Sequence, residues 1–500
     1  MFLSAQPIYS IAETREIETR YVAGSRPTLM ERAGRAAAEE AVRLISNRPG
    51  PILIACGPGN NGGDGFVVAR HLLHAGREIE VAFVADASKL PADAAKARAD
   101  FLAAGGHVVS DLPAAPAQGW ALVVDALFGI GLQRPIEGRY ASWIQTLNAQ
   151  TSLRLALDIP SGLDADSGQP LGATFCATHT ATFIALKPGL LTNDGPDYCG
   201  QVNVHRLDLD APAILSPRGM SITPALFQQH LLPRRRNTHK GLFGSIGILG
   251  GNRGMLGAAL LAGRAAMWLG AGRVHLGLLH PQAPSVDTHH PELMLHTAAE
   301  LPLAQLNALA IGPGLGNDAE AAAQLSHLLG QSLPLVLDAD ALNLIGADPA
   351  LQQQLSARDA PDILTPHPAE AARLLGITTA AVQSDRLGAA LEIARRYRAS
   401  IVLKGSGSII ATADGRWFIN STGHPGMASA GMGDVLTGLT VSLLAQGWPA
   451  EQALIAAVHL HGAAADRLAR EGIGPVGLSA SETIDAARGV FNGWLIEAQS

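Results

Sequence analysis

The chain has 500 residues, a length typical of two or more domains, and its 47% of hydrophobic residues can fill large buried cores. A formal net charge of −7, with no long lysine- and arginine-rich stretch, argues against nucleic acid as the main partner. Cys56, Cys176 and Cys199 are too widely spaced to predict a disulfide framework or a zinc site. The first residues lack the basic start of a signal peptide, and Arg264 interrupts the apolar stretch 255–272. We therefore expect a soluble cytoplasmic protein that does not span a membrane.

Apolar runs alternate with helical patterns over the first 210 residues. We expect strands at Pro51–Ala55, Ile79–Val84, Leu122–Asp125, Leu153–Asp158, Thr180–Leu186 and Gln201–Leu207, and helices at Phe66–Leu73 and Pro91–Ala104. Such alternation predicts an α/β domain of the Rossmann-like, three-layer kind, with a mostly parallel sheet covered on both faces. Ligands of these sheets bind beyond the carboxyl ends of the strands, where Asp125 and Asp158 are expected.

The alternation restarts after a proline-containing segment, 211–236, which we expect to link a domain at 1–210 to a second domain at 237–500. Strands are expected at Ser245–Leu249, Val274–Leu279, Ala308–Ile311, Leu335–Leu337, Ile363–Leu364 and Ile401–Leu403. Helices are expected at Leu256–Leu269, Asp318–Leu329, Pro368–Leu375, Ser384–Tyr397, Asp434–Gln446 and Glu451–Leu468. The second domain is therefore also predicted to be α/β.

The segment Cys56–Gly65 reads CGPGNNGGDG and lies between a predicted strand and a predicted helix. Its glycines allow positive φ angles and close approach of the backbone to a ligand, and the start of a helix favours an anion. The spacing matches neither the dinucleotide fingerprint nor the P-loop. A plain tight turn is the simpler alternative, but the polar block Asn60–Asp64 favours a ligand-binding loop.

Asp125 and Asp158 are carboxylates at predicted strand ends, where an aspartate often only caps the next helix. Their neighbours suggest more. Asp125 precedes the loop Phe128–Leu132, and Asp158 opens the run DIPSGLD. A carboxylate at the floor of a pocket can act as an acid or base, or can hold a cation together with hydroxyl and carbonyl oxygens.

Residues 10–210 resemble the NAD(P)H-hydrate epimerase family in three motifs in order: GPGNNGGDG, DALFGIGLQRP and DIPSGLDADSG. The resemblance implies that Asp158 is the acid or base that helps invert the hydroxyl-bearing ring carbon. It implies a potassium ion near Asn61, Asp125 and Ser161. The substrate contacts that it implies are Asn60, Asn61, Gly62, Gly63, Asp64, Gly129, Ile130, Gly131, Leu132, Gln133, Arg134, Pro135 and Asp158.

The second half contains Gly426–Gly438, GMASAGMGDVLTG, whose glycines would place backbone amides around an anion at a helix start. Asp434 could then accept the proton of an attacking hydroxyl. The alternative is an acidic N-cap after a flexible loop. Further motifs are Gly312–Gly316 (GPGLG), Asp338–Asn343 (DADALN), Leu364–Glu370 (LTPHPAE) and Lys404–Ser408 (KGSGS), the last of which is more simply read as a hairpin loop.

These segments, from about Thr238 to the C-terminus, resemble the ribokinase-like superfamily and more closely the ADP/ATP-dependent NAD(P)H-hydrate dehydratases. The resemblance implies a ribokinase-like α/β domain in which Asp434 is catalytic. The hydrate contacts that it implies are Ala258, Gly314, His367 and Asp434. The nucleotide contacts that it implies are Lys404, Gly405, Ser406, Gly407, Ser408 and Gly433.

Together the two resemblances imply repair of hydrated NADH and NADPH. The first domain would interconvert the R and S hydrates, and the second would phosphorylate the S hydrate with ADP, so that phosphate leaves and NAD(P)H, AMP and phosphate result. The implied cofactors are K⁺ and Mg²⁺, with no assigned ligands for Mg²⁺. The expected partners are the hydrates and ADP, with neither nucleic acid nor membrane, and a homo-oligomer is expected.

Two other functions remain open. A vitamin-precursor kinase would share the ribokinase-like fold but would not explain the first 210 residues, and a stable phosphorylated product would favour it. Alternatively, the first domain could be a binding or scaffold module of an RNA-processing assembly. The acidic charge balance argues against this, whereas tight RNA binding without epimerisation would favour it.

Overall fold

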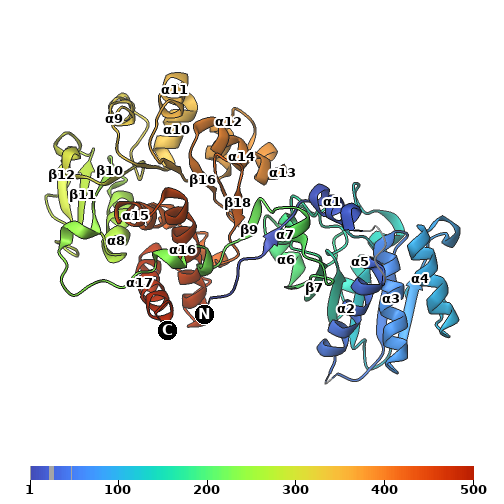
Figure 1. The fold of residues 1–500 in the computed structure, drawn as a ribbon. Helices are drawn as coiled ribbons and strands as arrows, with labels where there is room; N and C mark the ends of the chain where they lie inside the picture. Colours follow the sequence, from blue (N-terminus) through green and yellow to red (C-terminus); the bar gives the residue numbers. More distant parts are fainter. Residues whose placement is uncertain (1, 22–26, 47, 500) are drawn as a thin grey trace. The chain divides into compact units, whose positions relative to one another are not determined.

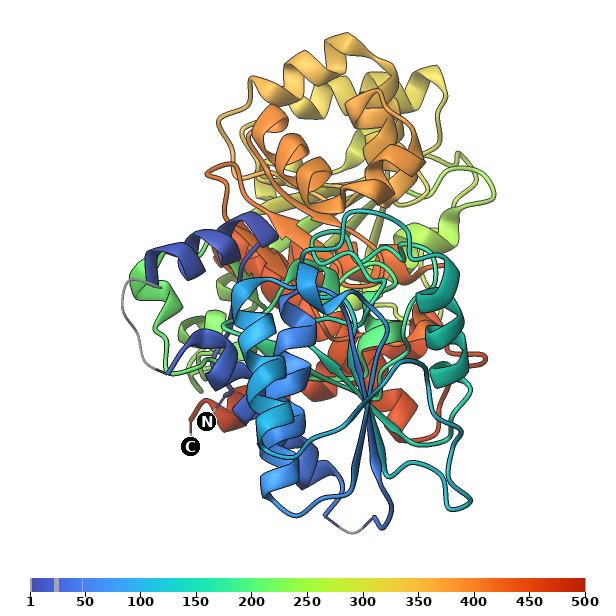
Figure 2. The same cartoon turned by 90° about the vertical axis from the view of Figure 1, so that its right-hand side faces the viewer.

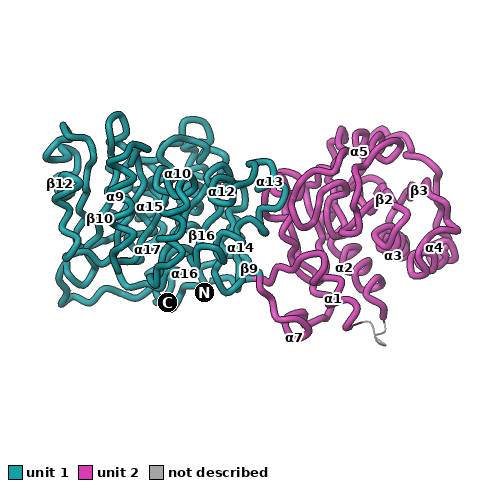
Figure 3. The backbone as a smooth tube through the Cα atoms, turned by 90° about the horizontal axis from the view of Figure 1, so that it is seen from above, with its two compact units in different colours: residues 1–5, 219–500 teal, residues 6–218 magenta. Residues whose placement is uncertain are grey.

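The computed structural model describes residues 2–21, 27–46 and 48–499. The chain forms two compact units (Figure 3). Unit 2 comprises residues 6–218, and unit 1 comprises residues 1–5 and 219–500. The chain therefore starts in unit 1, passes through unit 2 and returns to unit 1 at Gly219.

Unit 2 is built on a seven-stranded sheet in the order β4-β3-β2-β5-β6-β7-β8. All neighbouring strands are parallel. The strands are β2 (Ile52–Cys56), β3 (Ile79–Phe83), β4 (Val108–Val109), β5 (Leu122–Ala126), β6 (Leu153–Leu157), β7 (His179–Phe183) and β8 (Gln201–His205), and a short β1 (Pro7–Ile8) precedes them. The strand order changes direction between β2 and β5. Predicted site residues lie at the carboxyl ends of both strands, which is where sheets of this kind bind ligands.

Helices cover both faces of this sheet. They are α1 (Ile11–Tyr21), α2 (Leu29–Leu44), α3 (Asn60–His74), α4 (Ala92–Ala103), α5 (Gly138–Asn148), α6 (Gly195–Cys199) and α7 (Ala211–Ile214). Figure 2 shows the sheet nearly edge-on, with the blue helices α3 and α4 on one side and the teal α5 on the other. The core on the first side includes Phe66 and Phe101, and the core on the second includes Trp143. The predicted three-layer arrangement is thus confirmed.

Helix α3 begins at Asn60, six residues before the predicted start at Phe66, so most of the glycine-rich segment is helical. The glycines are required by close packing. A Cβ on Gly62 would lie 2.0 Å from the Gly57 carbonyl oxygen, and one on Gly65 would lie 2.8 Å from the Cys56 sulfur. Only residues 57–59 form the turn, and the polar block Asn60–Asp64 forms the first helical turns.

Unit 1 contains a mixed sheet in which the strands run in the order β9-β18-β17-β16-β15-β14-β13-β10-β11-β12. The strands are β9 (Gly219–Ser221), β10 (Ser245–Gly250), β11 (Arg273–Leu278), β12 (Met294–Thr297), β13 (Ala308–Ile311), β14 (Leu335–Leu337), β15 (Ile363–Leu364), β16 (Ser400–Leu403), β17 (Ile409–Ala411) and β18 (Trp417–Ile419). Strand β17 is antiparallel to β16 and β18, and the other pairs are parallel.

Two groups of helices lie on opposite faces of this sheet (Figure 1). One group consists of α8 (Leu256–Trp268), α15 (Met432–Ala445), α16 (Ala450–Arg470) and α17 (Ala480–Glu497). The other consists of α9 (Ala319–Leu329), α10 (Ala339–Ala347), α11 (Pro349–Ser356), α12 (Pro368–Leu375), α13 (Thr379–Ser384) and α14 (Arg386–Tyr397). Helix α15 packs closely on α8, because a Cβ on Gly438 would lie 2.1 Å from the Ala262 carbonyl oxygen. The predicted helices of this half agree with the structure within two residues.

The segment 211–236, predicted to be a linker, is built into the two units. It contains α7, strand β9 and two short 3₁₀ helices, and β9 pairs with β18 in the sheet of unit 1. Phe2 also packs against the core of unit 1, so the expected first domain at 1–210 does not keep its first residues. None of the helices in the described part of the chain combines the length and the apolar character that a membrane span requires.

Candidate active sites

Unit 2 has a cavity of about 880 Å³ at the carboxyl ends of β2, β5 and β6. Ten of the predicted epimerase residues line it: Asn60, Asn61, Asp64, Gly129, Ile130, Gly131, Leu132, Gln133, Arg134 and Asp158. Gly62 and Gly63 are buried within α3, and Pro135 does not line the cavity. The structure therefore brings the two predicted loops and Asp158 together around one space large enough for a small-molecule ligand.

Asp125 and Ser161 bind each other beneath this cavity. The Ser161 hydroxyl donates to Asp125 Oδ1 at 2.6 Å, and the Ser161 amide donates to Oδ2 at 2.8 Å. Asp125 is fully buried, and burial raises its pKa to about 6 although these hydrogen bonds favour the charged form. The next helix, α5, starts only at Gly138, so Asp125 is not a helix cap.

Asn61 is the third residue predicted near potassium. Its side chain is buried, and neither its Oδ1 nor its Nδ2 has a hydrogen-bond partner among the described residues. A buried amide without a partner is costly, so it indicates a site for a ligand. Asn61 lies beside the loop after β5, because a Cβ on Gly129 would be 3.4 Å from Asn61 Oδ1. Together, the side-chain oxygens of Asn61, Asp125 and Ser161 are of the kind that suits a cation such as K⁺.

Asp158 follows β6 with a φ of +66°, a left-handed conformation that is unfavourable for a non-glycine residue. Its amide donates to the Ala181 carbonyl oxygen at 2.8 Å, which holds the turn. Lys187 Nζ donates to Asp158 Oδ1 at 2.5 Å, and the Lys187 side chain is only 1% exposed. The carboxylate at the cavity floor is therefore paired with a buried ammonium group.

Two more carboxyl groups line the same cavity. Burial raises the pKa of Asp64 well above its usual value, and the nearby charges of Asp158 and Glu18 raise it further. Burial also raises the pKa of Glu18, with Asp158 adding to the effect and Lys187 and Arg15 opposing it. The cavity thus holds acidic groups of different proton affinity, an arrangement suited to proton transfer.

In unit 1, the buried Asp338 organises a polar network at the end of β14. Lys404 Nζ and the Thr365 hydroxyl donate to its Oδ1 at 2.9 and 2.8 Å, and the Thr437 hydroxyl donates to its Oδ2 at 2.9 Å. Burial alone would raise the pKa of Asp338, but Lys404 and these hydrogen bonds outweigh it and lower the pKa. Burial would lower the pKa of Lys404, but Asp338 and Glu370 raise it. Both groups are therefore charged.

Asp434 lies in the first turn of α15, which begins at Met432 after the N-cap Gly431. The alternative of an acidic N-cap is therefore wrong. Burial raises the pKa of Asp434 to about 7, with the Asp338 carboxylate adding to the effect and Lys404 opposing it. A Cβ on Gly433 would lie 3.4 Å from Lys404 Nζ, so the structure brings Lys404, Gly433 and Asp434 together.

The segment Lys404–Ser408 is the hairpin loop between the antiparallel β16 and β17, as the simpler reading expected. Ser408 Oγ accepts from the Gly405 amide at 3.3 Å and donates to the Gly405 carbonyl oxygen at 3.0 Å. Gly405 and Gly407 have φ angles of +144° and +59°. The hairpin positions Lys404 next to Asp338. The hairpin geometry is therefore compatible with the nucleotide binding predicted for Lys404–Ser408.

Two predicted hydrate contacts, Ala258 and Gly314, are neighbours, because a Cβ on Gly314 would lie 3.3 Å from the Ala258 Cβ. His367 is the N-cap of α12. Its Nδ1 accepts from the Ala369 and Glu370 amides at 3.1 and 3.4 Å. Burial lowers the pKa of His367, and the Lys404 charge lowers it further. His367 thus has a structural role as the cap of α12, and its contact with the hydrate stays a prediction.

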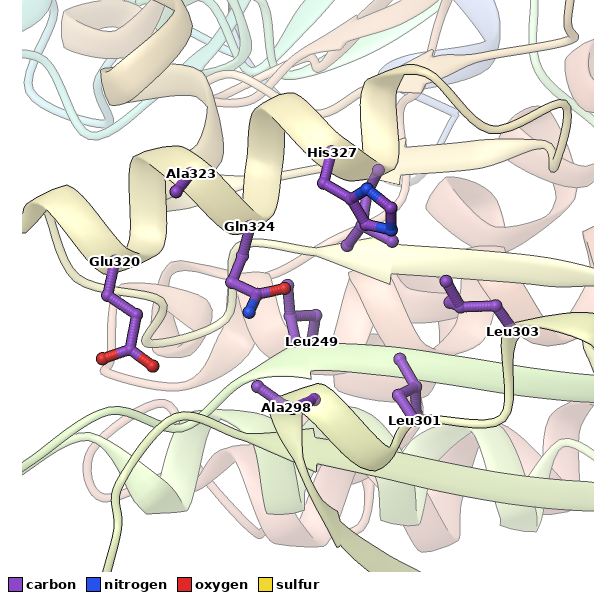
Figure 4. Close-up of a pocket in the computed structure, with 10 residues that line it drawn as sticks. Leu249, Ala298, Leu301, Leu303, Glu320, Ala323, Gln324 and His327 are labelled. Carbon is purple, nitrogen blue, oxygen red and sulfur yellow. The ribbon is translucent and has the colours of Figure 1, made fainter.

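A separate cavity of about 310 Å³ lies in unit 1 between α9 and the segment after β12 (Figure 4). Glu320, Gln324 and His327 project toward it from one face of α9, and Leu249 and Leu301 lie opposite. The ten described residues that line it include none of the predicted site residues. The two groups of predicted residues therefore lie elsewhere, one in each unit.

The sequence reasoning missed Lys187, Glu18, Asp338 and Glu370 as members of these sites. Lys187 had a signal, since it is a single charge within the apolar run IALKPGLL. A lysine in such a run is buried only if it is paired. Asp338 was noted within DADALN but given no role. Glu18 carried no signal, because α1 is amphipathic and rich in charge.

Comparisons with known proteins agree with this division. A family model described as YjeF-related protein N-terminus matches residues 26–189, and one described as NAD(P)H-hydrate dehydratase matches residues 246–485. The bifunctional NAD(P)H-hydrate repair enzyme Nnr of Coxiella burnetii is 37% identical over 97% of this chain and 99% of its own. The enzyme of the same name from Escherichia coli is 38% identical over 88% of this chain and 85% of its own.

Among solved structures, an ADP/ATP-dependent NAD(P)H-hydrate dehydratase from Bacillus subtilis, co-crystallised with ATP and Mg²⁺, is 31% identical. It covers 53% of this chain and 97% of its own, with a TM-score of 0.46. The full-length sequence similarity and the two family models, each matching the unit that holds the corresponding predicted residues, identify the family. The chain belongs to the bifunctional NAD(P)H-hydrate repair enzymes.

Proposed function

We propose that the chain repairs hydrated NADH and NADPH in two steps, epimerisation in unit 2 and nucleotide-dependent dehydration in unit 1. The observation that carries the proposal is the coincidence of two independent sites with the two matched family regions. In each site, a carboxylate predicted to be catalytic lies near a lysine, the buried Lys187 in unit 2 and Lys404 in unit 1. A product of the first site is the substrate of the second, which accounts for their presence in one chain.

In unit 2, Asp158 is the proposed acid or base. The ring carbon that bears the hydroxyl is also bonded to the ring nitrogen. To invert it, one of these bonds must break and form again, and either route requires a group that takes and returns a proton. Arg15 and Arg134 also line the cavity and supply positive charge for the phosphates of the substrate. Asn61, Asp125 and Ser161 would hold K⁺, which would add positive charge near the bound ring.

In unit 1, Asp434 is the proposed base that takes the proton of the S-hydrate hydroxyl as the oxygen attacks phosphorus. The amides at the start of α15 and Lys404 would bind the transferred phosphoryl group. Phosphate is a better leaving group than hydroxide, so its elimination restores the dihydronicotinamide ring. Ala258, Gly314 and His367 are the proposed hydrate contacts, and Gly405, Ser406, Gly407 and Ser408 the further nucleotide contacts.

ADP is the proposed phosphoryl donor, with AMP and phosphate as products. In the described part of the chain, no three His, Cys, Asp or Glu side chains form a cluster that could hold a metal ion. Asp338 is fully engaged by Lys404, Thr365 and Thr437. We therefore propose that Mg²⁺ arrives on the nucleotide and assign it no protein ligand. A homo-oligomer remains a prediction.

The test uses the full chain with a mixture of R and S hydrates and ADP, and follows the epimer ratio by chromatography and NADH by absorbance. Asp158→Asn should slow epimerisation by a factor of about a hundred or more while dehydration of pure S hydrate continues. Asp434→Asn should stop dehydration of the S hydrate while epimerisation continues. The exposed Asp197→Asn and Asp359→Asn, one in each unit, are the matched controls. Normal activities in both site variants would refute the assignment.

A further inference from the structure

Lys187 is an ammonium group buried at the edge of the unit 2 cavity, just after β7. Its Nζ donates to Asp158 Oδ1 at 2.5 Å, to the Thr182 hydroxyl at 2.9 Å and to the Phe183 carbonyl oxygen at 2.8 Å. An ammonium group has three N–H donors, and all three are used. The group therefore has no free lone pair with which to act as a base or a nucleophile toward the substrate.

The same contacts fix one oxygen of Asp158. Oδ1 is held by Lys187, whereas Oδ2 has no hydrogen bond to a described residue, and Asp158 lines the cavity. The left-handed turn at Asp158 is stabilised by the hydrogen bond that its backbone N–H donates to the Ala181 carbonyl oxygen. The carboxylate is thus held in one orientation from two sides, with one oxygen left for the substrate.

The other charged groups around Asp158 explain why this pairing matters. Glu18 on α1 and Asp64 on α3 line the same cavity, and their acidic groups interact unfavourably with the Asp158 charge. Arg15 on α1 and Arg134 in the loop after β5 also line it, and both are largely exposed. Among the described residues, Lys187 is therefore the buried cation in direct contact with Asp158, and without it the carboxyl groups of Glu18 and Asp64 would face Asp158 with no buried counter-charge.

We propose that Lys187 is the positioning residue of the epimerase site: by binding Oδ1 it supplies the counter-charge of the Asp158 carboxylate and leaves Oδ2 as the oxygen that exchanges a proton with the substrate hydroxyl. The inference rests on the proposed function of this site and adds to it a residue that acts through Asp158. The contacts with Thr182 and Phe183 occupy the other two N–H donors, so the ammonium group can be buried without an unsatisfied donor.

The test is the pH–rate profile of epimerisation in Lys187→Met and Lys187→Arg. Methionine has a similar length and removes the charge. Glu18 and Asp64 then face Asp158 without a buried counter-charge, so the acidic limb should move to higher pH by about one unit or more. At a pH on that limb the rate should fall by about tenfold or more for each unit, and activity should recover as the pH is raised. Arginine keeps the charge, so its acidic limb should stay near that of the wild type even if the rate is lower.

If the substitution only damaged the structure of unit 2, the rate would fall by the same factor at every pH. An unshifted acidic limb in Lys187→Met would therefore overturn the inference, as would a limb that moves equally in Lys187→Arg. If Lys187→Met does not fold, an acidic limb that moves to higher pH in Lys187→Arg, which keeps the charge, would still overturn the inference. Dehydration of pure S hydrate checks that unit 1 of each variant is intact. Normal epimerisation in Asp158→Asn would instead refute the proposed function, so the two failures are distinguishable.

Discussion

Asp434→Asn should make the free protein more stable while it abolishes dehydration, and the gain in stability should depend on pH. The folded protein holds the pKa of Asp434 at about 7, against 3.8 in an unfolded chain, chiefly because the carboxyl group is buried and faces Asp338. A raised carboxyl pKa means that the folded state binds the proton more tightly than the unfolded state. Stability is therefore lost as pH rises from about 4 to about 7.

The size of the effect follows from the shift. Each pKa unit corresponds to about 1.4 kcal/mol, so the full shift corresponds to at most about 4 kcal/mol. Partial exposure of the side chain and salt screening reduce this figure, and we expect about 1–3 kcal/mol. Asparagine has the same shape and no charge, so the variant avoids this loss. The variant should thus match the wild type near pH 4 and exceed it near pH 8.

The assay is urea unfolding of both proteins at a series of pH values, without nucleotide, with Asp359→Asn as the control. Dehydration of the S hydrate is measured over the same range. The wild-type rate should rise about tenfold between pH 6 and pH 8 as Asp434 ionises. A variant that is destabilised equally at all pH values would refute the reasoning, because the carboxylate would then be a favourable structural group and not a strained base.

Two further predictions concern unit 2 and the start of the chain. Asn61→Ala removes the buried amide that has no described partner. Wild-type epimerisation should be faster in potassium chloride than in tetramethylammonium chloride, and the variant should lose that difference; a potassium effect that persists would remove Asn61 from the site. Phe2→Ala should lower the stability of unit 1 by about 1–2 kcal/mol, since Phe2 packs on its core. Epimerisation should be unchanged, and an unaltered unfolding curve would contradict the packing.

Strands and helices of both units were predictable because their hydrophobic patterns are local. Strands such as β13 and β14 agree with the sequence reading residue for residue. Helix α3 was predicted to start too late, because six residues with three glycines do not look helical. Their helical conformation is stabilised by the packing of Gly62 and Gly65 against β2 and its loop. The short edge strands β4 and β12 were missed, since two to four residues carry little periodic signal.

The two sites show which part of an active centre a sequence reveals. Asp125 and Asp158 were predictable as site residues because each lies at the end of a buried strand, and the parallel sheet of unit 2 places those ends along one edge. The lysine partners of Asp158 and Asp338 were not predicted, because Lys187 and Lys404 contact these carboxylates across 29 and 66 residues of sequence. Only the folded chain decides which charges meet.

The lysine–carboxylate pairs of the two units also differ in a way that matches the chemistry proposed for each site. In unit 2 the buried lysine binds Asp158 itself, so the carboxyl group of the proposed acid or base is held in one orientation. In unit 1 the lysine binds Asp338, and Asp434 has no direct ion pair with a described residue. Burial raises the pKa of Asp434 to about 7, and the Asp338 carboxylate adds to the effect. An unpaired carboxyl group with a pKa near neutrality is a stronger base than an ordinary aspartate and can still ionise. A base that must deprotonate a hydroxyl during phosphoryl transfer needs that strength. An acid or base that only exchanges a proton during a reversible epimerisation does not need that strength.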